Sequence, residues 1–435
     1  MKVLVIGSGG REHALVWAVR KSATRSLRLF CAPGNAGIAQ EAECVPLSAT
    51  DLSSLAQFAE AEKIELTIVG PEAPLAAGIV NYFERRGLTI AGPPQEAARL
   101  ESSKAFAKDF MARHRIPTAR YKIAASVIEA QEILRDGEFG PEESSVVVKA
   151  DGLAGGKGVI VARSRAEAES AIDDLMVGGS VGAEAARRIL IEDVLEGREA
   201  SLLLFADGRN WALMPAARDH KRIGENDTGP NTGGMGAITD PGVLDEKMLA
   251  RVVNEVVGPT LEGARDEGFP FRGVLFIGLM LTEDGPRVLE YNVRFGDPEA
   301  QAILVRLQTD LLDIFQAMTH EGLSQLPVQW SAESSACVVL ATRGYPARPE
   351  TGARIEGLER ARLHQGVEIF HAGTKRSASG DWLTAGGRVL GVTATAATID
   401  LALRRCYEAV SDIDWDGMQY RRDIGRFNTS SSQTA

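Results

Sequence analysis

The sequence predicts an α/β protein of three parts: an N-terminal domain with a doubly wound parallel sheet, a two-lobed α+β domain, and a small mixed β/α domain at the C-terminal end. Three observations predict this fold class. The chain of 435 residues is too long for one hydrophobic core. Short apolar runs alternate with helical patterns over residues 1–100, which is typical of a parallel sheet. Glycine-rich loops between pairs of apolar strands follow in the middle of the chain.

The N-terminal domain is expected to cover residues 1–101. Its predicted buried strands span residues 3–6, 27–31, 66–69 and 88–91, with helices at 11–21, 51–62 and 77–86 between them. Each strand runs into a turn rich in glycine or proline. Because ligands of such sheets bind outside the carboxyl ends of the strands, these turns are candidate binding loops.

The two-lobed domain is expected to cover residues 102–325, with a small lobe at about 121–193. Its predicted elements are helices at 102–114 and 166–176, strands at 146–149, 159–162, 189–194 and 199–205, and an antiparallel pair at 274–281 and 287–293. A glycine-rich loop at 219–236 precedes that pair. Loops of this length are usually functional or disordered.

The last domain is expected to cover residues 332–425, after a polar linker within 321–335. Strands are predicted at 337–341 and 388–393 and a helix at 399–410. The remaining residues, 426–435, form a polar tail that we expect to be flexible.

Composition excludes several classes of protein. The net charge of −11 argues against a nucleic-acid or anionic membrane surface, and no apolar run reaches the roughly 20 residues that span a bilayer. Four scattered cysteines suggest neither a disulfide framework nor a zinc site. We therefore expect a soluble cytoplasmic protein without nucleic-acid or membrane partners. A monomer or a weak dimer is the expected oligomeric state, although composition does not indicate it.

The segment 288–301 carries the strongest chemical signal. Since side chains alternate along a strand, Glu290, Asn292 and Arg294 should share one face, with Leu289, Tyr291 and Val293 on the core face. Carboxylate and amide oxygens suit Mg²⁺ that also holds phosphates, and a guanidinium suits a carboxylate or phosphate. Alone, this pattern would favour a solvated strand face with a charged exit loop, and the neighbouring segments decide against that interpretation.

The loop at 7–13 begins like a dinucleotide-binding fingerprint but does not complete it. Glu12 stands where the third glycine is needed, and no acidic residue ends the second strand. A nicotinamide or flavin enzyme is therefore disfavoured. The loop can still bind one phosphate at a helix N-terminus, or it can be a tight turn only.

The loop at 151–158 is a second candidate for phosphate binding. It fails the Walker A pattern, because Asp151 and Gly158 replace the required residues. It is instead a glycine-rich hairpin with Lys157 at its tip and Lys149 on the strand before it. Phosphate binding explains both lysines better than a mobile turn does.

The segment 191–199 joins two strands and can hold a nucleoside. Strand-edge backbone at 192–194 can read an adenine, and Glu199 can accept a hydrogen bond from a ribose hydroxyl. Without the neighbouring motifs, an exposed turn is the better explanation of this segment.

Four segments in this order resemble the ATP-grasp superfamily. They are the hairpin at 151–158, the strand at 189–194 (the hinge strand), the glycine-rich loop at 219–236 and the strand that carries Glu290 and Asn292. The resemblance narrows to the phosphoribosylamine–glycine ligase family. It rests on seven motifs: GGREH at 9–13, PGNAG at 33–37, GPEAPL at 70–75, DHKR at 219–222, GPNTGGMGA at 229–237, RFGDPEAQ at 294–301 and HAGTK at 371–375. It covers residues 1–425.

The resemblance implies ATP-dependent ligation of glycine to 5-phosphoribosylamine in de novo purine biosynthesis, through glycyl phosphate, with ATP and Mg²⁺ or Mn²⁺ as cofactors. ATP-binding residues would be Lys104, Lys149, Gly155, Gly156, Lys157, Gly158, Glu192, Val194 and Glu199, and the metal ligands Glu290 and Asn292. Catalytic residues would be Arg294, Asp297 and Asp219. Substrate-binding residues would be Gly9, Gly10, Arg11, Glu72, Asp219, Lys221, Arg294 and Gly296.

Two alternatives remain beside the ligase. One is an ATP-grasp enzyme that uses bicarbonate or formate in place of glycine. The other is a catalytically inactive nucleotide-binding scaffold, which predicts loss of Glu290, Asn292 or Lys149, and all three are present.

Overall fold

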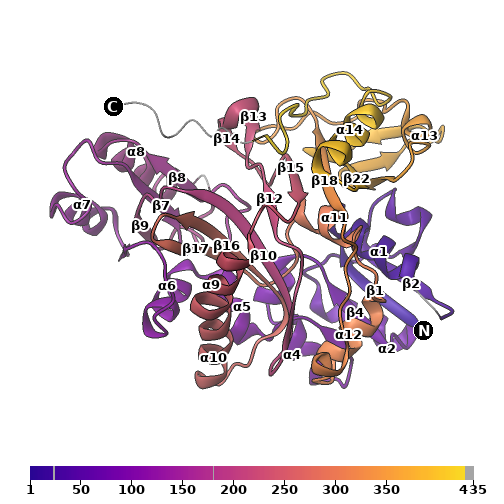
Figure 1. The fold of residues 1–435 in the computed structure, drawn as a ribbon, viewed down its shortest axis with the longest axis horizontal. Helices are drawn as coiled ribbons and strands as arrows, with labels where there is room; N and C mark the ends of the chain where they lie inside the picture. The colour runs from indigo at the N-terminus through magenta and orange to yellow at the C-terminus, as the bar shows by residue number, and fades with distance from the viewer. Residues whose placement is uncertain (23–24, 180, 427–435) are drawn as a thin grey trace.

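The structure, a computed structural model, describes residues 1–22, 25–179 and 181–426 (Figure 1). It confirms the predicted fold class, with a parallel N-terminal sheet, a two-lobed domain with antiparallel sheets and a C-terminal domain. All but the first residue of the predicted tail lies outside the described residues. In Figure 1 the small lobe projects on the left, and the N-terminal and C-terminal parts lie on the right.

The N-terminal sheet has five parallel strands in the order β3-β2-β1-β4-β5. The strands are β1 Lys2–Gly7, β2 Arg28–Pro33, β3 Glu43–Cys44, β4 Leu66–Val69 and β5 Ile90–Ala91, and the helices are α1 Gly10–Ser22, α2 Leu52–Glu62, α3 Glu72–Ala76, α4 Ile79–Glu84 and α5 Gln95–Ser102. The helix predicted at 77–86 is shorter, because Gly78 adopts a left-handed conformation (φ 83°) between α3 and α4.

The small lobe is a four-stranded sheet in the order β6-β9-β7-β8. Its elements are β6 Tyr121–Ala124, α7 Val127–Arg135, β7 Val146–Ala150, β8 Val159–Ala162, α8 Arg165–Met176 and β9 Ile189–Asp193. Helix α6, Lys104–Arg113, leads into the lobe and is capped by the Ser103 hydroxyl. Strand β6 and helix α7 were not predicted from the sequence.

The largest sheet runs from the large lobe into the C-terminal domain, in the order β17-β16-β10-β12-β15-β18-β22-β19, with β11 paired to β10 (Figure 1). Its strands are β10 Arg198–Asp207, β11 Trp211–Leu213, β12 Ala217–Asp219, β15 Gly236–Thr239, β16 Arg272–Thr282, β17 Gly285–Asn292, β18 Ser334–Ala341, β19 Val367–His371 and β22 Arg388–Ala396. Because β15 pairs with β18, the C-terminal strands extend the sheet that carries β17.

The remaining elements lie around these sheets. The glycine-rich loop contains a small hairpin, β13 Arg222–Gly224 and β14 Thr228–Asn231. The helices are α9 Glu246–Val252, α10 Gly258–Asp266, α11 Glu299–Leu304, α12 Leu311–Thr319, α13 Leu358–Ala361 and α14 Ile399–Val410, and the last two short strands are β20 Thr374–Arg376 and β21 Trp382–Thr384. Over the described ranges, no helix is long and apolar enough to span a membrane.

One detail of β17 corrects the simple alternation expected there. The pairing with β16 shifts register between Gly278 and Leu279, which leaves Leu289 as a bulged residue. Leu289 is therefore only partly buried and Val288 enters the core in its place, whereas Tyr291 and Val293 are buried as predicted. Beyond the bulge the alternation is regular, so Glu290 and Asn292 share a face as predicted.

Candidate functional site

The residues after the β17 bulge form an acidic and amide pair beside an arginine. Arg294 donates a hydrogen bond from Nη2 to Asn292 Oδ1 at 3.1 Å. Its guanidinium also lies 2.7 Å from a Glu101 carboxylate oxygen and 3.3 Å from a Glu72 carboxylate oxygen. Glu101 further accepts a hydrogen bond from the Val293 backbone N–H at 2.7 Å. Glu101, which the sequence analysis did not select, thus anchors the segment that carries Arg294.

Glu290 is surrounded by cations. Burial alone raises the pKa of its carboxyl, but Lys221, Lys104 and Lys149 together hold that pKa below its ordinary value. In the described part of the chain, this carboxylate has neither a hydrogen bond nor an ion pair. It is therefore ionised and available as an oxygen ligand.

The pair Glu290 and Asn292 fits a hard divalent cation that takes its other ligands from phosphates and water. The described residues contain no group of three or more histidine, cysteine or carboxylate side chains that could hold a metal ion. A site made by the protein alone is thus not present among them. A shared site, completed by nucleotide phosphates, is what this donor set allows.

The glycine-rich hairpin is fixed at its base and exposed at its tip. Asp151 accepts hydrogen bonds from the Ser103 hydroxyl and the Ala105 N–H, both at 2.8 Å, so the hairpin is attached to the start of α6. Lys104 lies there too, where burial lowers its pKa. A Cβ on Gly156 would lie 3.6 Å from the Thr232 carbonyl oxygen. The hairpin tip, with Gly155 and Lys157, therefore approaches the glycine-rich loop at 219–236.

Strand β9, the hinge strand, carries Glu192, which forms a buried group of three charges with Lys149 and Lys108. Lys149 and Lys108 both place Nζ 2.9 Å from Glu192 Oε2, and Lys149 also donates to the Leu289 carbonyl at 3.3 Å. Glu192 Oε1 is buried without a hydrogen-bond partner among the described side chains. Burial lowers the pKa of Lys108 to about 8. Val194 follows directly after β9.

Lys108 was also missed by sequence reasoning. Its spacing from Lys104 places both lysines on one face of α6, which was a usable signal. A lysine in a helix is normally solvated, so the sequence alone favoured a surface role.

A second set of interacting charges lies around Asp219 and Lys221. Lys221 lies 2.8 Å from a Glu199 carboxylate oxygen, and this lysine lowers the pKa of Glu199. Burial raises the pKa of Asp219. Burial, followed by the Asp219 charge, raises the pKa of Glu299 to about 8. Glu299 lies within the motif at 294–301, but the sequence analysis did not select it as a site residue.

Gly296 has a steric role in this loop. A Cβ there would fall 2.3 Å from Glu299 Oε2 and 3.0 Å from the Phe276 ring. A side chain at this position would therefore have to displace the buried Glu299 carboxylate and press on the Phe276 ring.

The N-terminal loop meets the same region from the other side. Arg11 lies 2.6 Å from a Glu12 oxygen and 3.9 Å from a Glu72 oxygen, and it donates to the Phe295 carbonyl at 3.1 Å. Gly9 donates its N–H to Glu12 at 2.6 Å. Glu12 thus folds back over the loop, in agreement with the incomplete dinucleotide fingerprint.

Asp297 connects this loop to the large lobe. A Cβ on Gly9 would lie 3.3 Å from Asp297 Oδ2, and one on Gly10 would lie 3.7 Å from Asp297 Oδ1. Arg388 from the C-terminal domain contacts Asp297 as well, at 3.2 Å. The predicted substrate-side residues of two domains are therefore brought together, with an arginine from the third that the sequence analysis did not select.

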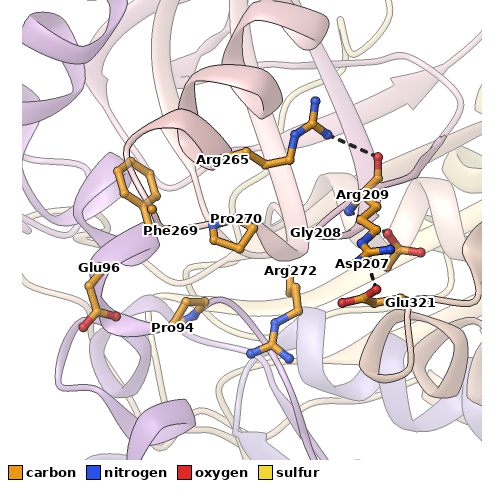
Figure 2. A pocket seen from close by; sticks show the side chains of 11 residues that line it. Pro94, Glu96, Asp207, Gly208, Arg209, Arg265, Phe269, Pro270, Arg272 and Glu321 are labelled. Carbon is orange, nitrogen blue, oxygen red and sulfur yellow. Dashed lines mark hydrogen bonds and ion pairs between the residues drawn. The ribbon is translucent and has the colours of Figure 1, made fainter.

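A cavity of about 530 Å³ shares no lining residue with these groups (Figure 2). Its arginines are already engaged: Arg209 with Glu321 at 3.0 Å, Arg272 with Glu84 at 2.8 Å, and Arg265 with the Arg209 carbonyl at 3.3 Å. The chemistry indicated by the motifs therefore lies outside this cavity.

Comparison with known families identifies all three parts of the chain. Three models described as phosphoribosylglycinamide synthetase match: the N domain at residues 1–101, the ATP-grasp (A) domain at 102–300 and the C domain at 335–427. Phosphoribosylamine–glycine ligase of Xylella fastidiosa is 47% identical over 428 residues, which are 98% of this chain and 97% of that protein. The enzyme of that name from Salmonella typhimurium is 46% identical, with 98% of each chain covered.

Solved structures agree with this assignment. The crystal structure of phosphoribosylamine–glycine ligase from Thermotoga maritima has a TM-score of 0.83 and 34% identity, covering 97% of this chain and all of that one. Biotin carboxylase from Campylobacter jejuni, with a TM-score of 0.71 and 14% identity over 96% of this chain and 92% of its own, shares the fold alone. The resemblance found in the motifs is thereby confirmed, and this chain belongs to the phosphoribosylglycinamide synthetase family of ATP-grasp ligases.

Proposed function

We propose that this protein ligates glycine to 5-phosphoribosylamine at the expense of ATP, giving glycinamide ribonucleotide, ADP and phosphate. Near full-length identity to ligases of that name supports the proposal. The structural observation that carries it is the meeting of three kinds of group at one place. These are the oxygen pair Glu290 and Asn292, the lysines around them, and the loop of the N-terminal domain beside Asp297.

The first step joins a glycine carboxylate oxygen to the γ-phosphorus of ATP and releases ADP. Such a transfer depends on positioning and charge neutralisation more than on a nucleophilic side chain. Lys104, Lys149 and Lys157 would neutralise the phosphates, and Arg294 would orient the glycine carboxylate. A divalent ion at Glu290 and Asn292, Mg²⁺ or Mn²⁺, would neutralise phosphate charge when bound.

The nucleoside would lie along the hinge strand. We propose that Glu192 and the Val194 backbone contact adenine, and that Glu199 accepts from the ribose. The buried Glu192 oxygen without a partner supports the adenine contact, because it can accept a hydrogen bond from an exocyclic amine. Gly155, Gly156 and Gly158 would let the hairpin backbone close over the phosphates.

In the second step the amine of phosphoribosylamine attacks the carbonyl carbon of glycyl phosphate, an amide bond forms and phosphate leaves. The loop residues Gly9, Gly10 and Arg11, with Glu72, would border this substrate, and Gly296 and Lys221 would flank the acyl group. Asp219, whose pKa is raised by burial, would take the proton that the amine loses. Asp297 would fix the loop that presents the acceptor.

We also propose a cytoplasmic location and a monomer or weak dimer. The four cysteines, Cys31, Cys44, Cys337 and Cys406, are all free thiols, which agrees with a reducing compartment.

Phosphate release from ATP, measured with each substrate omitted in turn, tests the proposal. Phosphoribosylamine would be formed in situ from ribose 5-phosphate and ammonia. Release that requires both glycine and the amine is expected. Release that ignores glycine but depends on bicarbonate or formate would overturn the substrate assignment, and ATP binding without any release would favour the scaffold alternative.

A further inference from the structure

One arginine of the C-terminal domain enters the site of the other two domains. Arg388, at the start of β22, donates from Nη1 to the Gly233 carbonyl and to the Asp297 carbonyl, both at 2.6 Å. Its Nη2 lies 3.2 Å from Asp297 Oδ2. Only about a fifth of the side chain is exposed, at 21%. Charge-assisted contacts of this kind are stronger than neutral hydrogen bonds.

The same domain holds Gly233 a second time. The Gly233 N–H donates to the Tyr345 hydroxyl at 2.9 Å. Both polar backbone groups of this glycine are therefore bonded to side chains of the C-terminal domain. A Cβ on Gly233 would lie 3.0 Å from the Arg388 guanidinium carbon, so the guanidinium packs closely against this glycine.

The contacts continue to the loop of the N-terminal domain. Next to Gly233, a Cβ on Gly234 (φ 111°) would fall 2.4 Å from the Pro298 ring, so the glycine-rich loop rests directly on the segment at 297–298. Asp297 in turn lies beside Gly9 and accepts from Gln301 at 2.8 Å. The Arg388 guanidinium thus contacts the glycine-rich loop and Asp297 directly. Through Asp297 it is connected to the loop at residues 9–11.

We propose that Arg388 is a positioning residue for the phosphoribosylamine side of the site and has no part in nucleotide binding. The inference rests on the proposed function for its substrate. Within the described chain, none of the contacts of Arg388 is with Lys104, Lys149, Glu192 or Glu199, which form the nucleotide side. Loss of Arg388 should loosen the glycine-rich loop and the segment around Asp297, which would position phosphoribosylamine. The hinge strand at 189–194 and the lysines Lys104 and Lys149 should stay in place.

The kinetic test compares Arg388→Lys and Arg388→Ala with a matched control, Arg354→Ala, an exposed arginine of the same domain that pairs with Asp381 and Glu356. In Arg388→Ala, kcat/KM for phosphoribosylamine should fall about a hundredfold, as expected when a reacting group is misplaced by about 1 Å. The Kd for ATP should stay within about twofold of the wild type. Added guanidinium should restore part of the activity of Arg388→Ala, and Arg354→Ala should be unchanged.

A second readout does not depend on the reaction. Hydrogen exchange of the peptide at 229–236 should speed up in Arg388→Ala and in Tyr345→Phe, while exchange of the hinge at 189–194 stays as in the wild type. Unchanged exchange of the loop, or an equal loss of ATP affinity, would overturn the role of Arg388. A wild-type protein that does not turn over phosphoribosylamine would overturn the proposed function instead, and the exchange result would still decide the positioning role.

Discussion

Glu101→Gln is the most informative change to the site, because it alters one charge and almost no volume. Glu101 is 7% exposed and its two oxygens have different partners, the Arg294 guanidinium at 2.7 Å and the Val293 N–H at 2.7 Å. A glutamine can keep one acceptor contact but loses the charge-assisted contact with Arg294. Hydrogen bonds to charged groups contribute about 1.5–3 kcal/mol each. At about 1.4 kcal/mol per factor of ten, kcat/KM for glycine should fall by about 10- to 150-fold.

The assay is initial-rate kinetics with glycine varied at saturating ATP and phosphoribosylamine. Since Glu72 remains 3.3 Å from Arg294, the guanidinium keeps one carboxylate partner and the fold should persist. A matched control is Glu267→Gln, which removes a partner of Arg113 and His114 outside the site. If Glu101→Gln kept the glycine kcat/KM of the wild type, Arg294 would not be positioned by Glu101 as we infer.

Three further predictions follow from the site. Glu290→Ala should abolish turnover with little loss of stability, because it removes an oxygen ligand and not a core side chain; activity near that of the wild type would exclude the metal role. Lys157→Ala, at the exposed hairpin tip, should chiefly weaken ATP binding, and titration calorimetry with an unchanged Kd would contradict this role. Glu299→Gln should flatten the dependence of stability on pH, as measured by urea unfolding between about pH 5 and 9. The Glu299 pKa is raised from 4.5 to about 8, so its contribution to stability is full below about pH 4.5 and is lost as the pH rises through 8, on the order of a few kcal/mol. A wild-type curve that rises over this range by the same amount would refute that assignment.

The strands of the N-terminal sheet could be predicted because parallel strands buried on both faces are continuous apolar runs. Residues 66–69 are an example, and all four are buried in β4. Strand β6 could not be found in this way. It is four residues long at the edge of its sheet, and only Ala124 is fully buried.

The pairing that makes the largest sheet continuous also could not be predicted from the local sequence pattern. Pairing of Ala237 with Cys337 joins β15 to β18 across a hundred positions of sequence. Periodicity over a short window carries no information about such a partner. The bulge at Leu289 was missed for the same reason, because it is defined by the register with β16.

The candidate site was predictable where its polar residues lie close together in the sequence, as in the motif that contains Glu290, Asn292 and Arg294. It was not predictable where a buried charge depends on a distant partner. Lys108, Glu101 and Arg388 bond residues far along the chain, Glu192, Arg294 and Asp297 respectively. In sequence each is a charged residue in a helix or strand, and the usual interpretation of such a residue is solvent exposure.

The most direct test of the proposed chemistry follows an oxygen atom. Glycine labelled with ¹⁸O in both carboxylate oxygens is incubated with ATP, a divalent cation and phosphoribosylamine, and the released phosphate is analysed by mass spectrometry. Formation of glycyl phosphate followed by attack of the amine predicts one ¹⁸O in each phosphate and one in the amide product. Unlabelled phosphate, formed at the same rate as product, would show that ATP does not activate the glycine carboxylate and would contradict the mechanism.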